Sequence, residues 1–193
     1  MLYGMCFFCV KFAVYAMLLW MPMFLEEQMG VEDQKIANIE TLYEVGTVVG
    51  AIILGLTSDK CGGRRSPIAM VAVICGFLIS LSFFAVYKSY PTTLWLIAMF
   101  FFGFFLGSLH HLICITVSAD LGRSHSKQAT STITGIIDGM GTAGSGIGQL
   151  LLGILIENFG WRLGFFLPIT IVLGLTLLPL TKILYRELSE IKI

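Results

Sequence analysis

A lysine inside an otherwise apolar segment is the residue of this chain best suited to bind an anion. Lys11 lies in the run LYGMCFFCVKFAVYAMLLWMP, which contains no other charged residue. A charge at the centre of a membrane-spanning helix costs about 2.5–3.5 kcal/mol, so such residues usually face a cavity or a partner. We therefore expect Lys11 either to meet an anion in a water-filled path or to extend to the membrane surface near the start of the chain.

Several uncharged side chains are candidates to accompany this lysine. Tyr15 and Trp20 follow it on the same segment and are expected to line a cavity, or alternatively to serve as packing or interfacial aromatic residues. His110 and His111 are adjacent, so on a helix they point about 100° apart and only one can face a cavity. An imidazole can donate to a phosphate, which makes His110 a candidate binding residue; the alternative is a hydrogen-bonded core histidine.

Two acidic residues lie inside apolar runs. A long stretch without charge follows Glu44, and such stretches lie on both sides of Asp138. One hypothesis is that they form coupling salt bridges that change partner between two conformations, and another is that they make structural hydrogen bonds. A carboxylate repels phosphate, so neither is expected to bind it directly. Either could neutralise Lys11 when no substrate is bound.

A short, charged and glycine-rich loop separates two apolar runs at GLTSDKCGGRR, residues 55–65. Because such a loop cannot lie in hydrocarbon, it must be at a membrane face. Asp59, Arg64 and Arg65 are expected to form a latch on the cytoplasmic side, the acid at a helix N-terminus and the arginines on carboxylates or terminal carbonyls. The alternative is that the basic residues only fix the loop on the cytoplasmic side.

The composition indicates that lipid is the solvent. The chain has 193 residues, of which 56% are hydrophobic and 12% charged, whereas soluble domains have about 25% charged residues. A spanning helix needs about 20 apolar residues, so the sequence predicts an all-α membrane protein with six transmembrane helices. The expected spans are 3–25, 38–57, 67–87, 92–117, 129–156 and 161–184. A net charge of zero gives no indication of a nucleic-acid partner.

The distribution of basic residues predicts the orientation of these spans, because cytoplasmic loops are enriched in Lys and Arg. One side carries Lys60, Arg64, Arg65, Arg123, Lys127, Lys182, Arg186 and Lys192. The other side carries Lys35, Lys88 and Arg162, together with an acidic cluster at residues 26–33. Both termini are therefore expected to face the cytoplasm.

The remaining patterns concern packing. No metal or cofactor is predicted, because the C-x-x-C of Cys6 and Cys9 lies in an apolar run without partner ligands. Pairs of glycines in G-x-x-x-G spacing are expected to bring helices close together, either within this bundle or against another one. Glu44-Val45-Gly46 and Asp138-Gly139 lie in the middle helices of two sets of three, as an inverted 3+3 repeat would place them.

Taken in order, these motifs resemble the major facilitator superfamily, and within it the eukaryotic sugar-phosphate exchangers. The first span resembles the K-x-x-x-Y-x-x-x-x-W-x-P pattern of that family, and Leu42-Tyr43-Glu44-Val45-Gly46 resembles its acid-Val-Gly segment. The loop ending in Gly62-Gly63-Arg64-Arg65 resembles the superfamily signature. The stretches VSADLG (117–122) and STITGIIDGMG (131–141) are the most specific part of the resemblance.

The resemblance implies that residues 1–193 form the C-terminal six-helix bundle of a major facilitator transporter, with the N-terminal half absent. It also implies exchange of a sugar phosphate or glycerol phosphate for inorganic phosphate, and a location in the endoplasmic reticulum membrane. Two features depart from the family pattern. Gly107-Ser108-Leu109-His110-His111 replaces a usual Gly-Pro, and the basic residue at position 11 lies about one turn from the arginine of bacterial relatives.

Two classes of function are compatible with these features. The first is transport as part of a full carrier, with a phosphate or organophosphate substrate, the lipid bilayer and a missing six-helix half as partners. The second is a non-transporting half-carrier that acts as a structural or assembly subunit of a membrane complex; a self-pairing half is a further possibility. An enzyme is not favoured, because the sequence has no H-E-x-x-H and no histidine in its fifth and sixth spans.

Overall fold

Lipid offers no hydrogen-bond partners, so a membrane segment satisfies its own backbone by forming helices. The computed structural model describes residues 2–60, 65–86, 91–113 and 129–189, and within these ranges every regular element is helical. The elements are α1 (Leu2–Met29), α2 (Asp33–Lys60), α3 (Ser66–Val86), α4 (Thr92–Phe102), η1 (Gly103–Gly107), α5 (Ser108–His111), α7 (Ala129–Trp161), η3 (Arg162–Phe166) and α8 (Leu167–Ser189). η1 and η3 are π-helical turns, a widened form of helix.

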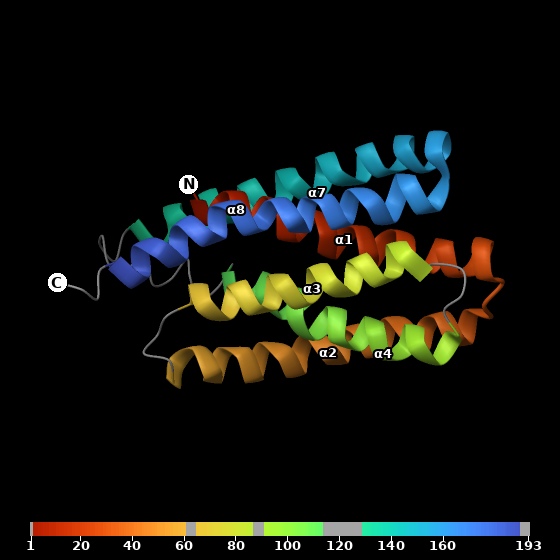
Figure 1. Cartoon of the computed structure of the whole chain (residues 1–193), viewed down its shortest axis with the longest axis horizontal. Helices are drawn as coiled ribbons and strands as arrows, with labels where there is room; N and C mark the ends of the chain where they lie inside the picture. The colour runs from red at the N-terminus through yellow and green to blue at the C-terminus, as the bar shows by residue number, and fades with distance from the viewer. Residues whose placement is uncertain (1, 61–64, 87–90, 114–128, 190–193) are drawn as a thin grey trace.

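Five helical stretches in the described part of the chain are long and apolar enough to cross a bilayer. Four of them are Leu2–Met29, Asp33–Lys60, Ser66–Val86 and Thr93–His111. The fifth, Ser131–Glu187, has 57 residues and contains Gly160, whose φ of 71° is a backbone conformation that favours glycine. The chain reverses there, so that α7 and α8 run in opposite directions (Figure 1).

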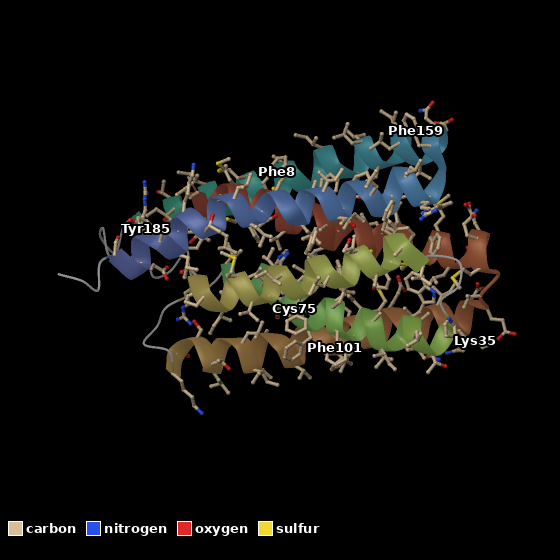
Figure 2. All side chains as sticks on the ribbon, viewed as in Figure 1. Phe8, Lys35, Cys75, Phe101, Phe159 and Tyr185 are labelled. Carbon is tan, nitrogen blue, oxygen red and sulfur yellow. The ribbon has the colours of Figure 1, made fainter. Side chains whose placement is uncertain are left out.

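The helices pack in a pattern set mainly by α1 and α2. α1 lies against both α7 and α8, while α2 lies against α4, η1 and α5, and α3 packs on α8. Figure 1 shows the start of α1, the end of α8 and the end of α2 at the same end of the bundle, together with both chain termini. Many of the large side chains on the outside are hydrophobic, as Phe159 and Tyr185 illustrate in Figure 2, and this suits a surface that faces lipid.

Glycines allow α2 to approach the helix formed by α4 and η1. A Cβ atom at Gly46 would lie 2.1 Å from the carbonyl oxygen of Phe100, and one at Gly103 would lie 2.1 Å from that of Tyr43. Small residues at such crossings let backbones come into contact. The G-x-x-x-G pairs at positions 46/50 and 103/107 therefore pack within this bundle, which is one of the two alternatives the sequence left open.

An aromatic cluster fills the end of the bundle opposite the termini. The rings of Phe83 and Trp95 stack with their centroids 4.7 Å apart, and Phe24 meets Phe166 edge to face at 5.0 Å. All four side chains are fully buried. They join α1, α3, α4 and η3, so this end of the bundle is tightly packed.

Some helix ends differ from those expected. α1 continues to Met29 and not Leu25, and α2 begins at Asp33 and not Asn38, because helices can extend as polar turns beyond the apolar segment. The helix expected to end at Ile156 continues to Phe159, where the non-helical Gly160 interrupts it. The expected end of the fourth span, at residues 114–117, lies outside the described residues.

Candidate functional site

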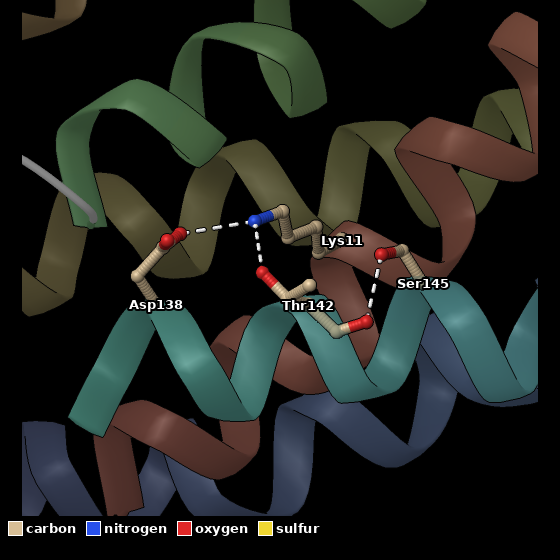
Figure 3. A network of polar contacts seen from close by, with 4 residues as sticks. All are labelled: Lys11, Asp138, Thr142 and Ser145. Atoms are coloured by element: carbon tan, nitrogen blue, oxygen red, sulfur yellow. Dashed lines mark hydrogen bonds and ion pairs between the residues drawn. The ribbon is translucent and has the colours of Figure 1, made fainter. Parts of the chain in front are cut away.

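Lys11 points from α1 across the bundle towards α7. Its side chain is buried, and its ammonium group donates hydrogen bonds to Asp138 Oδ1 and to Thr142 Oγ1, each at 2.9 Å (Figure 3). The first of these contacts is also an ion pair. The lysine is therefore held inside the structure by groups on a second helix. This agrees with the hypothesis that an acid neutralises Lys11, and the acid is Asp138.

Asp138 and Thr142 lie on one face of α7 because they are four residues apart on a helix. The two members of the ion pair differ in their surroundings: the side chain of Lys11 is 8% exposed and that of Asp138 is 47% exposed. The Ser145 hydroxyl donates to the Thr142 carbonyl at 2.9 Å and continues the polar line along the helix. The carboxylate is thus the solvent-accessible member of the ion pair, on what we call its open side, and the ammonium is the buried member.

A glycine on α7 makes room for the lysine. A Cβ atom at Gly141 would lie 2.5 Å from Cδ1 of Phe7 and 3.0 Å from Cδ of Lys11. Any larger residue would push against the aliphatic stem of the lysine. Gly141 therefore positions the ammonium although it makes no polar contact itself.

Aromatic rings surround the ammonium on the side of α1 and α5. The Lys11 nitrogen lies 5.4 Å from the ring centroid of Phe7 and 5.7 Å from that of Tyr15, within the range of cation–π attraction. The ring of His110 lies against the same two residues, with centroid distances of 5.2 and 6.1 Å. Three of the predicted binding residues, Lys11, Tyr15 and His110, are therefore close together.

The two histidines have different environments. Nδ1 of His110 is buried and has no hydrogen-bond partner among the described residues, whereas His111 is exposed. A buried polar atom without a partner carries a desolvation cost. The expectation that only one histidine turns inward fits this arrangement, and His110 is the one beside Lys11.

Trp20 lies apart from this group. It is nine residues after Lys11, about 13 Å further along the helix. Its indole nitrogen donates to Oε1 of Gln149 on α7 at 2.6 Å, and its ring packs edge to face on Trp161. Nε2 of Gln149 is buried without a hydrogen-bond partner in the described part of the chain. Gln149 was not singled out from the sequence, because a lone glutamine in an apolar run gives no motif.

Glu44, the second intramembrane acid, is exposed on α2. The helix face that it occupies also carries Thr41 and Val48, which are exposed too. The structure therefore separates the two acids: Asp138 is paired with the lysine, and Glu44 lies on an outer face.

The residues of the expected latch join the end of α2 to the start of α3. One guanidinium nitrogen of Arg65 donates to Asp59 Oδ1 at 2.8 Å and to the Ser58 hydroxyl at 2.9 Å. Arg64 lies outside the described residues. The described contacts of this latch are local, between neighbouring helix ends.

A second tie at the same end of the bundle links helices that are distant in sequence. The carboxylate of Glu187 on α8 accepts a hydrogen bond from the Tyr3 hydroxyl of α1 at 2.9 Å and one from the Ser66 hydroxyl of α3 at 2.5 Å. We refer to these three residues as the Glu187 clasp. No pattern in the sequence pointed to it, because Glu187 is one of several charged residues near the end of the chain.

Comparison with known proteins places this arrangement in a class of membrane transporters. Residues 3–191 match the Major Facilitator Superfamily, so the chain belongs to that family, and the resemblance noted in its motifs is confirmed. It is a multi-pass membrane protein of this class.

Several curated relatives align over nearly the whole chain. Sugar phosphate exchanger 3 of Gallus gallus is 30% identical over 97% of this chain and 37% of its own length. Glucose-6-phosphate exchanger SLC37A2 of Danio rerio is 32% identical over 96% of the chain and 38% of its own length. Putative glycerol-3-phosphate transporter 4 of Arabidopsis thaliana is 35% identical over 97% and 35%. The chain thus spans a little over a third of the length of these relatives.

Proposed function

We propose that this chain is the C-terminal six-helix half of a carrier that exchanges a phosphorylated small metabolite, a sugar phosphate or glycerol phosphate, for inorganic phosphate by alternating access. The observation that carries this proposal is the buried ammonium of Lys11, held 2.9 Å from a carboxylate that stands on the open side of the pair. The names of the relatives, which are sugar phosphate exchangers and glycerol phosphate transporters, support the substrate class.

The chemistry of the site suits binding and needs no bond to be made or broken. A phosphate oxygen can take the position of Asp138 Oδ1 on the ammonium, because both are anionic acceptors. The Thr142 hydroxyl accepts from Lys11 and so has its own hydrogen available to donate. His110 lies beside the ammonium and carries a buried nitrogen without a described partner. These three groups would hold one phosphoryl group.

The exposed face of α7 supports a second bundle as partner. Small and polar residues follow one another on this face at helical spacing: Thr132, Gly135, Gly139, Thr142 and Gly146 are all exposed. Polar groups facing lipid are costly, so such a face belongs against protein or a water-filled cavity. Lys11 and Asp138 lie at its edge. We place the transport cavity here, between this bundle and the remaining part of the carrier.

The packing supports six spans arranged as an inverted 3+3 repeat. The turn at Gly160 would divide the stretch Ser131–Glu187 into two crossings. If the first three helices correspond to the last three, contact of α1 with α7 corresponds to contact of α4 and η1 with α2, and both occur. The repeat relates α3 to α8 and α8 to α3, so their contact with each other, which also occurs, is its own equivalent. Major facilitator halves are built from such repeats.

The cytoplasmic side is assigned from the basic residues. The end of α2, at Lys60, and the start of α3, next to Arg65, lie at the end of the bundle that also carries both termini (Figure 1). Positive charge marks the cytoplasmic side. We propose that both termini are cytoplasmic, that Asp59 and Arg65 stabilise one access state, and that the endoplasmic reticulum is the host membrane by similarity to the eukaryotic exchangers.

Reconstitution tests the proposal directly. The chain is placed in liposomes with the portion of the Gallus gallus exchanger that it does not match; we call this pair the assembled carrier. Vesicles loaded with phosphate are then given labelled phosphate, glucose-6-phosphate or glycerol-3-phosphate. We expect counterflow of at least one ester. Lys11→Gln should abolish it, while Lys35→Gln, which removes an exposed lysine paired with Glu32, should not.

The alternative is a half-carrier with a structural or assembly role. The observation that favours it is that Lys11 already has an anionic partner within the chain, Asp138, and so needs no substrate to neutralise it. Membrane insertion with no counterflow in the assembled carrier, and none by the chain alone, would support this alternative over transport.

A further inference from the structure

We propose that Asp138 is a built-in counter-ion that lets the empty carrier reorient, so that the carrier performs net flux of its phosphate ester as well as exchange. This inference rests on the transport function proposed above. It concerns the coupling between substrate binding and movement, which the identity of the substrate does not determine.

The first step is that Lys11 is paired by groups of the chain itself. Its ammonium contacts Asp138 Oδ1 and Thr142 Oγ1, each at 2.9 Å. Strict exchange requires that the empty carrier be unable to change its access side. An unpaired buried cation provides such a block, because the closed intermediate excludes the water that would solvate it. In this chain the carboxylate removes that block.

The second step is that only the Asp138 side of the ion pair is accessible from outside the bundle. Lys11 is enclosed by the ring of Phe7 and by the backbone of α7 at Gly141, and its side chain is 8% exposed. The side chain of Asp138 is 47% exposed and has only two rotatable bonds to the backbone. An incoming phosphate therefore displaces the carboxylate, while the ammonium stays in place.

The third step concerns charge in the two forms of the carrier. When phosphate binds, it replaces the carboxylate as the partner of Lys11, and when it leaves, Asp138 returns. Lys11 is thus paired in both the loaded and the empty carrier. In the loaded form, a cation of the remaining part of the carrier would pair with the displaced carboxylate, whose side chain is 47% exposed. Both forms can then pass through the closed intermediate.

The test compares two transport modes in the assembled carrier. Exchange is measured as uptake of labelled glucose-6-phosphate or glycerol-3-phosphate into vesicles loaded with phosphate, and net flux as uptake into vesicles without it. For the unmodified chain we expect net uptake within about tenfold of exchange. Asp138→Asn leaves Lys11 unpaired in the empty form, and the ratio of net uptake to exchange should fall by about 100-fold or more. The ratio cancels differences in the amount of folded carrier.

Two further variants keep the test decisive. Glu32→Gln removes an exposed carboxylate from the pair with Lys35 and should leave the ratio unchanged. Asp138→Ser replaces Asp138→Asn if the latter is not recovered as a monodisperse protein, and the same fall is expected. Exchange without net uptake by the unmodified chain, or an unaltered ratio in the Asp138 variants, would overturn this inference and leave the proposed function standing. If the unmodified carrier shows neither mode, the proposed function itself fails.

Discussion

The two charges of the central ion pair have unequal access to water, and their removal should have unequal effects. Lys11 is buried against Phe7 and Tyr15, whereas 47% of the Asp138 side chain is exposed. A charge left unpaired costs more where it cannot be hydrated. Losing the ion pair therefore destabilises the protein more when the lysine is left without its partner than when the aspartate is.

This asymmetry predicts the stabilities of three variants. Asp138→Asn leaves a buried ammonium without its anion and should lower the unfolding free energy by about 2–3 kcal/mol. Lys11→Gln leaves a carboxylate that water can reach and should cost about 1 kcal/mol or less. The double variant Lys11→Gln/Asp138→Asn should be more stable than Asp138→Asn alone. Thermal unfolding in one detergent measures the order, and a larger loss for Lys11→Gln would contradict the assigned burial.

The position of Gly141 predicts a loss of binding without a change of charge. Gly141→Ala places a methyl group 3.0 Å from the Lys11 stem and 2.5 Å from the Phe7 ring, so the lysine side chain must shift from its present position. A displacement of about 1 Å in a binding group can cost about 100-fold. We expect phosphate counterflow to fall by that order. Gly55→Ala on α2, where no atom lies within 4 Å and which is not on the α7 face assigned to the cavity, is the control.

At the scale of helices, the glycines of α7 separate into two faces with different roles. A Cβ atom at Gly144 would lie 2.3 Å from the carbonyl oxygen of Phe8 on α1, whereas one at Gly139 would meet no atom within 4 Å. The inner face therefore sets the distance between α1 and α7, and with it the position of Lys11. The glycines of the outer face, such as Gly139, do not set a distance between helices of this bundle.

Matched substitutions on the two faces should give opposite results. Gly144→Ala forces α1 and α7 apart against a rigid backbone, and should lower the unfolding free energy by about 1–3 kcal/mol. Gly139→Ala adds a methyl group in open space and removes backbone freedom, so its stability should be equal or higher. Thermal unfolding of both variants of the isolated chain in detergent measures the difference, and equal losses would show that the two faces are packed alike.

The Glu187 clasp makes a prediction about the end of the bundle that carries both termini. Glu187→Ala removes two hydrogen bonds to a carboxylate and leaves the Tyr3 and Ser66 hydroxyls without this acceptor. Hydrogen bonds to charged groups contribute about 1.5–3 kcal/mol each, and less where water competes. We expect a loss of about 2 kcal/mol for Glu187→Ala and a smaller loss for Tyr3→Phe, measured by thermal unfolding. A loss for Tyr3→Phe as large as that for Glu187→Ala would contradict the clasp.

The elements differ in how far the sequence could predict them. Apolar length predicted the long helices, because each needs only enough hydrophobic residues to cross a bilayer. Lys11 stood out because it is a single charge in such a run. Its pairing with Asp138, 127 residues away, depends on which helices become neighbours, and the sequence offered Glu44 equally. The spacing of the α7 glycines predicted close packing, but only the structure shows that positions 144 and 148 face α1 while 139 and 146 do not.

At the scale of the whole molecule, the ends of the bundle differ in their chemistry. One end carries the Asp59–Arg65 pair, the Glu187 clasp and both termini, and the other is filled by the cluster around Phe24 and Trp95. Polar ties of this kind can be broken and re-formed at modest cost, whereas a packed aromatic cluster resists change. The polar end is therefore where the helices of this bundle can most readily shift against one another.

The open face of α7 leads to a final prediction about assembly. Gly146 is exposed, and a Cβ atom added there would meet no atom within 4 Å, so Gly146→Trp should not disturb the isolated chain. If a second bundle packs on this face, the indole ring must block it, because small residues allow close approach and large ones prevent it. Co-purification with the complementary portion of the Gallus gallus exchanger should then fall at least about tenfold.

The matched control for this prediction lies on a different face. Leu178 of α8 is 63% exposed and apolar, as expected for contact with lipid, so Leu178→Trp should assemble like the unmodified chain. Both variants should elute as the isolated unmodified chain does in detergent. If Gly146→Trp co-purifies as well as Leu178→Trp, the polar face of α7 is not a contact between bundles, and its small residues must instead border the water-filled cavity beside Asp138.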